Sequence, residues 1–245
     1  MTVSSACPGN RPTGVVVSDL HLFARRSAGV EQMRGLGSRL ERASLLVLNG
    51  DTFDFRWSTL PDHGTSVARA LDWIEALLAE RPDREVHCVL GNHDCLDAFV
   101  VQLDPLAARR PNFHWHPDSV QIGEAVFLHG DCANGWMDAA ALDRYRASWR
   151  QDRQRHGMAT TAYEWLDRLG ITRRAHRWQF PRRRTLARLV YHLDRTRPQW
   201  RGTVRRCYFG HTHEPFSDVT HEGITFHNTG SAIVGMAFNP LVFGW

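Results

Sequence analysis

Short runs of apolar residues recur along the chain, and turn-forming residues bound each of them. The runs cover residues 14–17, 45–48, 86–90, 125–128, 206–209 and 224–227. Their apolar positions are largely continuous rather than alternating, which is typical of strands buried on both faces. Residues 66–80 instead place apolar side chains at helical spacing on one face. This alternation of strands and helices predicts an α/β architecture.

The pattern changes between residues 138 and 205. Strand signals fade there, and helical patterns follow at residues 137–154, 161–170 and 182–195, with Gly and Pro between them. Strand patterns flank this stretch on both sides. We therefore expect a single domain over residues 1–245, with a helical lid inserted at about residues 133–205.

Length and composition suit a globular protein with a sizeable core. The chain has 245 residues, of which 42% are hydrophobic. No apolar run is long enough for a membrane-spanning helix, and the N-terminal residues lack the pattern of a secretory signal. Five scattered Cys residues favour reduced thiols, and hence a cytoplasmic location.

Positive charge is concentrated in the expected insertion. All 30 basic residues are Arg, which a coding bias toward GC would also produce. Residues 133–206 hold 18 Arg against 6 acidic residues, whereas the rest of the chain holds 12 Arg against 20 acidic residues. Because Arg binds phosphate in a bidentate fork, this asymmetry indicates a basic segment that faces an anionic partner. The acidic remainder is suited to metal cations.

Polar clusters follow five of the predicted strands at their carboxyl ends. They read SDLH at 18–21, NGDTFD at 49–54, GNHD at 91–94, HGD at 129–131 and GHTH at 210–213. Ligands of open α/β sheets bind beyond the carboxyl ends of the strands, so we expect these clusters to converge on one cleft. The candidate metal ligands are Asp19, His21, Asp51, Asn92, His129, His211 and His213.

Each cluster alone also has a structural explanation, because Asp and Gly form turns and a lone His is often a buried structural residue. Their shared placement at strand ends favours a metal site. Imidazole, carboxylate and amide ligands favour Mn²⁺, our first choice, with Fe²⁺ or Zn²⁺ as alternatives, over Mg²⁺. Seven ligands exceed the needs of one ion, so we predict two divalent ions about 3.5–4 Å apart that share a carboxylate.

The motifs D-x-H, G-D-x-x-D, G-N-H-D, H and G-H-x-H occur in this order and resemble those of the calcineurin-like metallophosphoesterase superfamily. The resemblance implies a four-layer α/β/β/α sandwich with a dinuclear site at its rim. It assigns Asp19, His21, Asp51 and His213 to one ion, and Asp51, Asn92, His129 and His211 to the other. Asp51 then bridges the two ions.

The resemblance also implies a reaction. A metal-bound hydroxide would attack phosphorus in line and cleave a phosphodiester or pyrophosphate bond. His93 would lie over the phosphate, where it stabilises charge or protonates the leaving oxygen. Asp94 would either orient His93 or cap the turn, and we include both residues as catalytic candidates.

Within the superfamily, the stretches SDLHL, NGDTFDF, LHGD and GHTHEP look similar to bacterial UDP-2,3-diacylglucosamine pyrophosphatases, which also carry a helical lid. This similarity implies a nucleotide–lipid substrate at the cytoplasmic face of the inner membrane. The chain departs from that type at His93, where those enzymes commonly have Arg. The resemblance therefore supports the chemistry more firmly than the lipid substrate, and another phosphorylated small molecule is an alternative.

The Arg-rich insertion supplies the candidate substrate-binding residues Arg177, Arg182 and Arg183. Its basic, amphipathic character fits peripheral membrane contact, but also a solvated helix that packs its apolar face on the core. Nucleic acid is the disfavoured partner, because no known nucleic-acid module is recognisable. Alternative functions are a phosphomonoesterase of the same fold, a nuclease that uses the insertion, and a non-catalytic scaffold. Oligomeric state leaves no signal in the sequence, and the apolar residues 237–245 could pack on the core, a partner subunit or a membrane.

Overall fold

The computed structural model describes residues 13–151, 154 and 178–244. In this part of the chain, ten strands form two five-stranded sheets. The first sheet has the order β10-β1-β2-β3-β4, and its strands are β1 (Thr13–Val17), β2 (Leu45–Asn49), β3 (Glu85–Val89), β4 (Phe113–His116) and β10 (Leu241–Gly244). Strands β1 to β4 are parallel, and β10 is antiparallel to β1.

The second sheet has the order β5-β6-β7-β9-β8. Its strands are β5 (Ser119–Ile122), β6 (Ala125–Leu128), β7 (Arg206–Phe209), β8 (Phe216–His221) and β9 (Ile224–Asn228). Strands β6, β7 and β9 are parallel to one another, whereas β5 and β8 form antiparallel edges.

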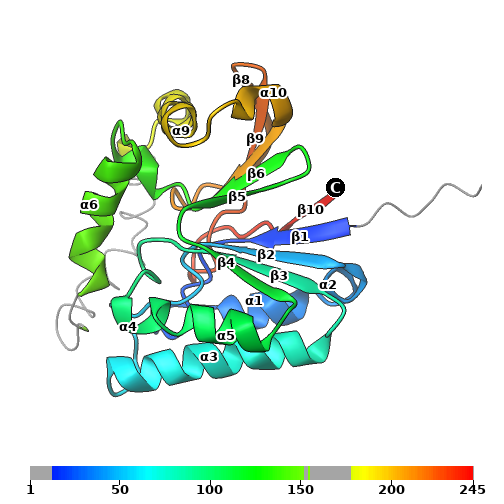
Figure 1. Cartoon of the computed structure of the whole chain (residues 1–245), viewed down its shortest axis with the longest axis vertical. Coiled ribbons are helices and arrows are strands. Elements are labelled where there is room, and N and C mark those ends of the chain that lie inside the picture. The colour runs from blue at the N-terminus through cyan, green and yellow to red at the C-terminus, as the bar shows by residue number, and fades with distance from the viewer. Residues whose placement is uncertain (1–12, 152–153, 155–177, 245) are drawn as a thin grey trace, which may run out of the picture.

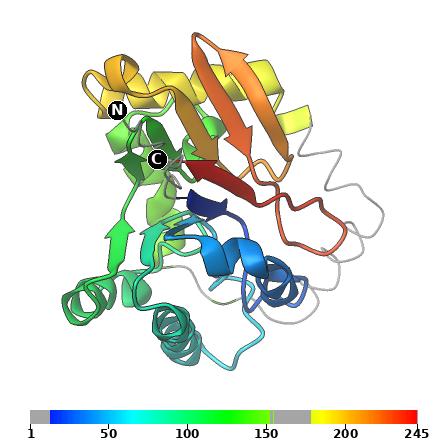
Figure 2. The same cartoon turned by 90° about the vertical axis from the view of Figure 1, so that its right-hand side faces the viewer.

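Helices cover the outer faces of both sheets (Figures 1 and 2). Those beside the first sheet are α1 (Gly29–Gly35), α2 (Ser38–Arg42), α3 (His63–Glu80), α4 (Asp97–Val100) and α5 (Leu103–Arg109). Those beside the second sheet are η1 (Asp131–Asn134), α9 (Arg182–Thr196) and α10 (Trp200–Thr203), whereas α6 (Ala139–Arg150) lies next to the carboxyl ends of the strands (Figure 1). The sheets face each other between these helices, so the predicted four-layer α/β/β/α architecture is confirmed.

The predicted central strands are buried on both faces, as their continuous apolar runs require. One face of β1 and β2 packs on the helices, where Val15 and Leu46 lie in the core. The opposite face packs between the sheets, where Val47 meets apolar side chains that include Phe127 of β6 and Phe243 of β10. This double burial explains why the pattern lacks the polar alternation of a half-exposed strand.

Helix α3 begins three residues before the predicted helix. The Asp62 side chain accepts a hydrogen bond from the Thr65 backbone N–H at 2.6 Å and so caps the helix. Its apolar face then buries residues that include Ala70, Ile74 and Leu78 against the first sheet. The cap, rather than the apolar pattern, sets where this helix starts.

The described part of the C-terminal apolar stretch packs on the core through Phe243, as in one of the three alternatives considered. β10 extends the first sheet beside β1, and the Phe243 side chain is only 3% exposed. Strands β4, β5, β8 and β10 are absent from the sequence-based assignment. Three of them have only four residues, and polar side chains interrupt most of the four strands, so pairing with a neighbour defines them more than their own pattern does.

The described part of residues 133–205 is helical, as predicted. α6 begins at its N-cap Asp138, which accepts from the Ala141 backbone N–H at 2.8 Å. α9 buries Leu189 and Leu193 against the second sheet, so for this helix the alternative of an apolar face packed on the core is confirmed. The predicted helix at 161–170 lies outside the described residues. None of the described helices has the length and apolarity needed to cross a membrane.

Candidate metal centre

The five polar clusters meet where the carboxyl ends of both sheets converge. Asp19, Asp51 and Asn92 follow β1, β2 and β3 of the first sheet. His129 follows β6 of the second sheet, and the GHTH segment follows β7. Backbone hydrogen bonds tie these loops together, for example from Asp19 N to Gly50 O at 3.0 Å. All seven predicted ligands are thereby brought to one site.

The backbone at this site is held in an unusual conformation. Five of the seven predicted ligands have positive φ, at 53° for Asp19, 47° for His21, 50° for Asp51, 63° for His211 and 55° for His213. This left-handed region costs a non-glycine residue about 1–2 kcal/mol. Strain of this kind persists where the surrounding structure enforces it, and it concentrates at functional sites. The conformation that directs these side chains inward therefore destabilises the fold locally.

The motif glycines provide the space in which the ligands approach. A Cβ atom at Gly91 would collide with the carboxylate and backbone N of Asp51. A Cβ atom at Gly210 would collide with the Asp19 carboxylate and with Ser18. Both glycines are thus required by the close approach of a ligand carboxylate to the neighbouring backbone.

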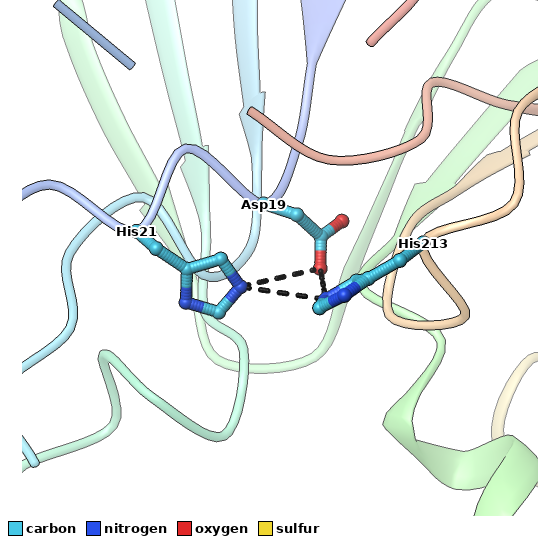
Figure 3. A group of neighbouring side chains, drawn as sticks. All are labelled: Asp19, His21 and His213. Atoms are coloured by element: carbon cyan, nitrogen blue, oxygen red, sulfur yellow. Dashed lines mark hydrogen bonds and ion pairs between the residues drawn. The ribbon is translucent and has the colours of Figure 1, made fainter. Parts of the chain in front are cut away.

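A first group of candidate ligands consists of Asp19, His21 and His213 (Figure 3). Asp19 Oδ1 lies 3.1 Å from His213 Nε2, and the Nε2 atoms of the two histidines are 3.4 Å apart. The other carboxylate oxygen of Asp19 accepts from Ser18 Oγ at 2.5 Å and from the His211 backbone N–H at 3.0 Å. These hydrogen bonds orient the carboxylate toward the two imidazoles.

A second group consists of Asp51, His129 and His211. Asp51 Oδ2 lies 3.2 Å from His129 Nε2, which in turn lies 3.3 Å from His211 Nδ1. The same Asp51 oxygen is 3.9 Å from His21 Nε2 of the first group. Asp51 therefore stands between the two groups, as expected of a bridging carboxylate.

The buried carboxylates of the site require positive charge beside them. Burial alone raises the pKa of the Asp51 carboxyl, but the charges of His129 and His93 outweigh it and hold this pKa well below its usual range. Burial likewise disfavours the His129 imidazolium, yet the Asp51 charge dominates and raises the pKa of His129 to about 10. A proton on His129 thus balances buried carboxylate charge that a divalent cation would balance more fully.

The donor set fits two divalent ions. Asn92 Oδ1 is buried and has no hydrogen-bond partner among the described residues. A buried carbonyl oxygen without a partner is costly, and a metal ion beside the Asp51 group would satisfy it. Asp19, His21, Asp51 and His213 would hold one ion, and Asp51, Asn92, His129 and His211 the other. Imidazole, carboxylate and amide donors are the types that borderline divalent metals accept.

His93 lies beside the two groups without joining either. Its Nδ1 is 3.0 Å from Asp54 Oδ1, and the second Asp54 oxygen is 3.3 Å from His21 Nδ1. Burial lowers the pKa of His93, but the charges of Asp54 and Asp51 reverse this and raise it to about 9. One carboxylate thereby orients both a candidate ligand and the candidate acid. The sequence-based reasoning assigned no role to Asp54, although it is the last residue of the G-D-x-x-D motif.

Asp94 makes hydrogen bonds within the turn. Its Oδ1 accepts from the Gly91 backbone N–H at 2.6 Å, and its Oδ2 accepts from the Thr52 backbone N–H at 2.8 Å. This geometry matches the turn-capping alternative and links the GNHD loop to the loop after β2. The carboxylate that orients His93 is Asp54, so a direct catalytic role for Asp94 stays a prediction.

An aromatic and basic rim surrounds the site. The Trp149 ring lies 4.6 Å from the His93 ring, and the Arg56 guanidinium lies 3.3 Å above Trp149. Together with other residues they line a cavity of about 290 Å³ that includes Asp51, Asn92 and His93. Trp149 belongs to α6, so the insertion contributes directly to the site. The sequence held no signal for this rim, because Arg56 and Trp149 are 93 positions apart.

A buried ion pair anchors α6 beside the site. Arg146 donates to both carboxylate oxygens of Asp131, at 2.7 and 2.8 Å, and to Leu90 O at 3.0 Å. Burial lowers the pKa of Arg146, but the charge of Asp131 outweighs it, so the guanidinium stays charged. α6 is thus fixed to the loops that carry His129 and Asn92.

The candidate substrate-binding arginines lie in different places. Arg182 pairs with Glu214 at 3.3 Å and stacks over Phe216. Arg183 lines a surface cavity of about 990 Å³. Arg177 lies outside the described residues. Of the three, Arg183 therefore faces an open cavity and Arg182 is engaged in a salt bridge.

Three solved structures match the chain at low identity. A phosphopantetheinyl hydrolase from Mycobacterium tuberculosis matches at 14% identity over 91% of each chain, with a TM-score of 0.47. A dimetal phosphatase from Danio rerio matches at 13% identity over 96% of this chain and 99% of its own, with a TM-score of 0.48. A nuclease from Pseudomonas putida matches at 13% identity over 95% of this chain and 76% of its own, with a TM-score of 0.40.

No curated protein sequence shows significant similarity to the chain. A family model described as calcineurin-like phosphoesterase, however, matches residues 14–215. This range holds every predicted ligand together with Asp54 and His93, and it covers most of the chain. The chain therefore belongs to the calcineurin-like phosphoesterases, enzymes that hydrolyse phosphoric esters.

Proposed function

We propose that the protein hydrolyses a phosphodiester or pyrophosphate bond with two divalent metal ions, Mn²⁺ being the first choice and Fe²⁺ or Zn²⁺ the alternatives. The observation that carries this proposal is the arrangement around Asp51. Two ligand groups adjoin this carboxylate, and its other oxygen accepts from the His93 backbone N–H at 2.8 Å. The site thus combines cation binding with a candidate proton donor in one cavity.

The chemistry divides between the ions and the chain. Two bound divalent ions supply Lewis acidity that neutralises phosphate charge and activates water. Asp54 holds His93 Nδ1, which leaves Nε2 to face the substrate. A protonated His93 then donates to the leaving-group oxygen, because its neighbouring carboxylates favour the charged imidazole. Arg56 and Trp149 enclose this imidazole and restrict water around it.

Two adjoining cavities favour a substrate with groups on both sides of the phosphorus. The outer cavity is lined by Trp136, Trp178, Gln179, Pro181, Arg183, Arg184 and Ala187. Gln179 also lines the cavity around His93, so the two spaces adjoin. A monoester needs only the inner cavity, whereas a diester or pyrophosphate could place its second group against the outer tryptophans and arginines.

A nucleotide–lipid substrate is the specific member of this class that we propose. The outer cavity combines exposed indole rings, 57% exposed at Trp136 and 88% at Trp178, with the side chains of Arg183 and Arg184. Indole and guanidinium groups together suit the boundary between lipid headgroups and acyl chains. Under this proposal the protein works in the cytoplasm and contacts the inner membrane peripherally at this surface.

The first test compares hydrolysis of bis-p-nitrophenyl phosphate and p-nitrophenyl phosphate by metal-stripped protein reloaded with Mn²⁺. We expect the diester to be preferred, and Asp51→Asn and His93→Ala to lower kcat by about 100-fold or more. His221→Asn, a histidine on β8 away from the site, is the matched control and should retain full activity. Preference for the monoester would contradict the proposal and favour a phosphomonoesterase.

A second pair of variants tests the outer cavity. Trp178→Ala should raise KM for the diester, while leaving KM for the monoester unchanged, if the second ester group lies there. Val101→Ala, an exposed apolar residue at the C-terminal end of α4, is the control for loss of surface area. Cleavage of single-stranded DNA that weakens steeply with salt would instead support the nuclease alternative.

A further inference from the structure

A separate group of potential metal ligands lies on β3 and β4, apart from the site described above. Glu85, His87 and His114 each offer one ligand atom, and these atoms all lie within 4.8 Å of one another. Glu85 opens β3, whereas the loop with Asn92 follows the other end of the strand. The group therefore belongs to the sheet itself and not to its catalytic rim.

Strand register explains why these side chains meet. Glu85 and His87 are two residues apart on β3 and so point to the same face. His87 pairs with His114 of β4 in the parallel register, which places their side chains next to each other. The two rings have centroids 4.8 Å apart. Glu85 is exposed and both histidines are partly exposed, so the group is reachable from solvent.

His116 contacts the ring of His87 directly. Its Nε2 lies 3.0 Å from His87 Nδ1, within hydrogen-bond distance. Such a contact needs one donor and one acceptor, so at least one of these imidazoles is neutral. When His87 donates through Nδ1, its Nε2 carries the lone pair, and this atom faces Glu85 Oε2 at 3.6 Å. Metal-binding histidines are commonly oriented by a hydrogen bond of this kind from the other ring nitrogen.

Burial and neighbouring imidazoles both disfavour the protonated forms of His87 and His116. Burial and the neighbouring His114 lower the pKa of His87. Burial and the neighbouring His87 lower the pKa of His116 to about 4. Protonation of His87 and His116 is thus disfavoured, whereas a cation bound at this group would also be attracted by Glu85.

We propose that Glu85, His87 and His114 bind one Zn²⁺ ion, and that His116 is a positioning residue for His87. Two imidazoles and one carboxylate form a donor set that zinc accepts, with a fourth position left for water. Tetrahedral bonds of about 2.0–2.1 Å place ligand atoms roughly 3.3 Å apart, which small side-chain rotations achieve from the present spacing. The ion would cross-link edge strand β4 to β3.

The test counts zinc in metal-stripped protein that is reloaded with Zn²⁺ and passed over a desalting column. Because Zn²⁺ also binds at the catalytic site, the deciding quantity is the difference in zinc content between the wild type and each variant. By inductively coupled plasma mass spectrometry, His114→Asn and Glu85→Gln should each retain about one zinc ion per chain fewer than the wild type. His221→Asn is the matched control, because His221 also faces a glutamate, Glu222, at 3.7 Å.

Two further readouts separate a metal site from a structural role. His116→Asn should weaken zinc affinity about 10–100-fold while leaving the three ligands in place. Mn²⁺-dependent hydrolysis should be unchanged in all these variants, which would show that the catalytic site and the fold are intact. Glu85→Gln alters an exposed side chain at the start of a strand and should not disturb folding. A loss of zinc in this variant therefore tests the proposal even if the histidine variants misfold.

Equal zinc content in the wild type and in the variants would overturn the proposal. The three histidines would then be a hydrogen-bonded strand contact, and their variants would change the melting temperature without any dependence on Zn²⁺. Diffraction data collected at the zinc absorption edge provide an independent check. An anomalous peak between β3 and β4 is expected, and peaks confined to the site around Asp51 would contradict the assignment.

Discussion

At the scale of single residues, two aspartates of the loop after β2 contact different parts of the site. Asp51 adjoins both ligand groups, whereas Asp54 contacts His93 with one oxygen and His21 with the other. Burial opposes ionisation of Asp54, but the charges of His93 and His21 outweigh it, so the pKa of Asp54 is lowered. A carboxylate that stays ionised can hold the imidazole Nδ1–H at any pH at which the protein works.

The role of Asp54 as a positioning residue can be measured. Asp54→Asn should lower kcat by about 100-fold or more at saturating Mn²⁺, because an amide neither stabilises the His93 imidazolium nor fixes its tautomer. Loss of the carboxylate should also lower the pKa of His93, so the basic limb of the kcat–pH profile should move to lower pH. Asp72→Asn, a surface change on α3, is the control, and an unshifted profile in Asp54→Asn would argue against the role.

At the scale of elements, α9 is held on the second sheet by a buried histidine as well as by its apolar face. His192 donates through Nδ1 to Met137 O at 2.9 Å, and its Nε2 lies 3.1 Å from Asp118 Oδ2. Both ring nitrogens therefore act as donors, which requires the imidazolium. Burial disfavours this cation, but the hydrogen bond and charge of Asp118 outweigh it and raise the pKa of His192.

This contact predicts how the stability of the protein depends on pH. A pKa that is raised in the folded state stabilises the protein fully below the unfolded pKa of about 6.5, and the stabilisation is lost as pH rises through the folded pKa. Asp118→Asn should therefore cost about 1–2 kcal/mol in the free energy of unfolding at pH 6, and clearly less at pH 9. Urea unfolding at both pH values measures this, and an equal cost at both would refute the charged contact.

At the scale of the whole molecule, the metal centre joins the two sheets. Asp19, His21, Asp51 and Asn92 come from loops of the first sheet, and His129, His211 and His213 from loops of the second. The apolar layer between the sheets includes Val47 and Phe127 and brings the two sets together. Ions that bind this composite site would bind only the packed arrangement, and so would stabilise it by mass action.

Removal of metal should therefore lower the thermal stability of the whole chain. One ion present at 100 times its Kd contributes about 2.7 kcal/mol, which corresponds to roughly 5–10 °C in Tm for a protein of this size. Scanning calorimetry of chelated protein, with and without added Mn²⁺, tests this. The shift should be much smaller in Asp51→Asn, which lacks the bridging carboxylate, and an unchanged Tm in the wild type would contradict the coupling.

The sequence by itself determined the central strands and the candidate ligands. Doubly buried strands must be continuously apolar, and the polar residues that follow parallel strands must lie at the carboxyl edge of their own sheet. Local pattern therefore suffices to place Asp19, Asp51 and His129 at such an edge. The family resemblance then supplied the pairing of ligands with ions. Helix α9 was also predictable, because its apolar spacing survives in a strongly basic segment.

Only the tertiary structure decided which side chains meet across distant loops. His93 is followed directly by Asp94, yet the turn draws Asp94 to the Gly91 and Thr52 amides and leaves Asp54 to hold His93. The same holds for Trp149 over His93, and for the strand register that places His87 beside His114. β10 and the other edge strands owe their conformation to hydrogen bonds with a neighbouring strand. Contacts of this kind depend on register and turn geometry, which no local pattern of apolar and polar residues encodes.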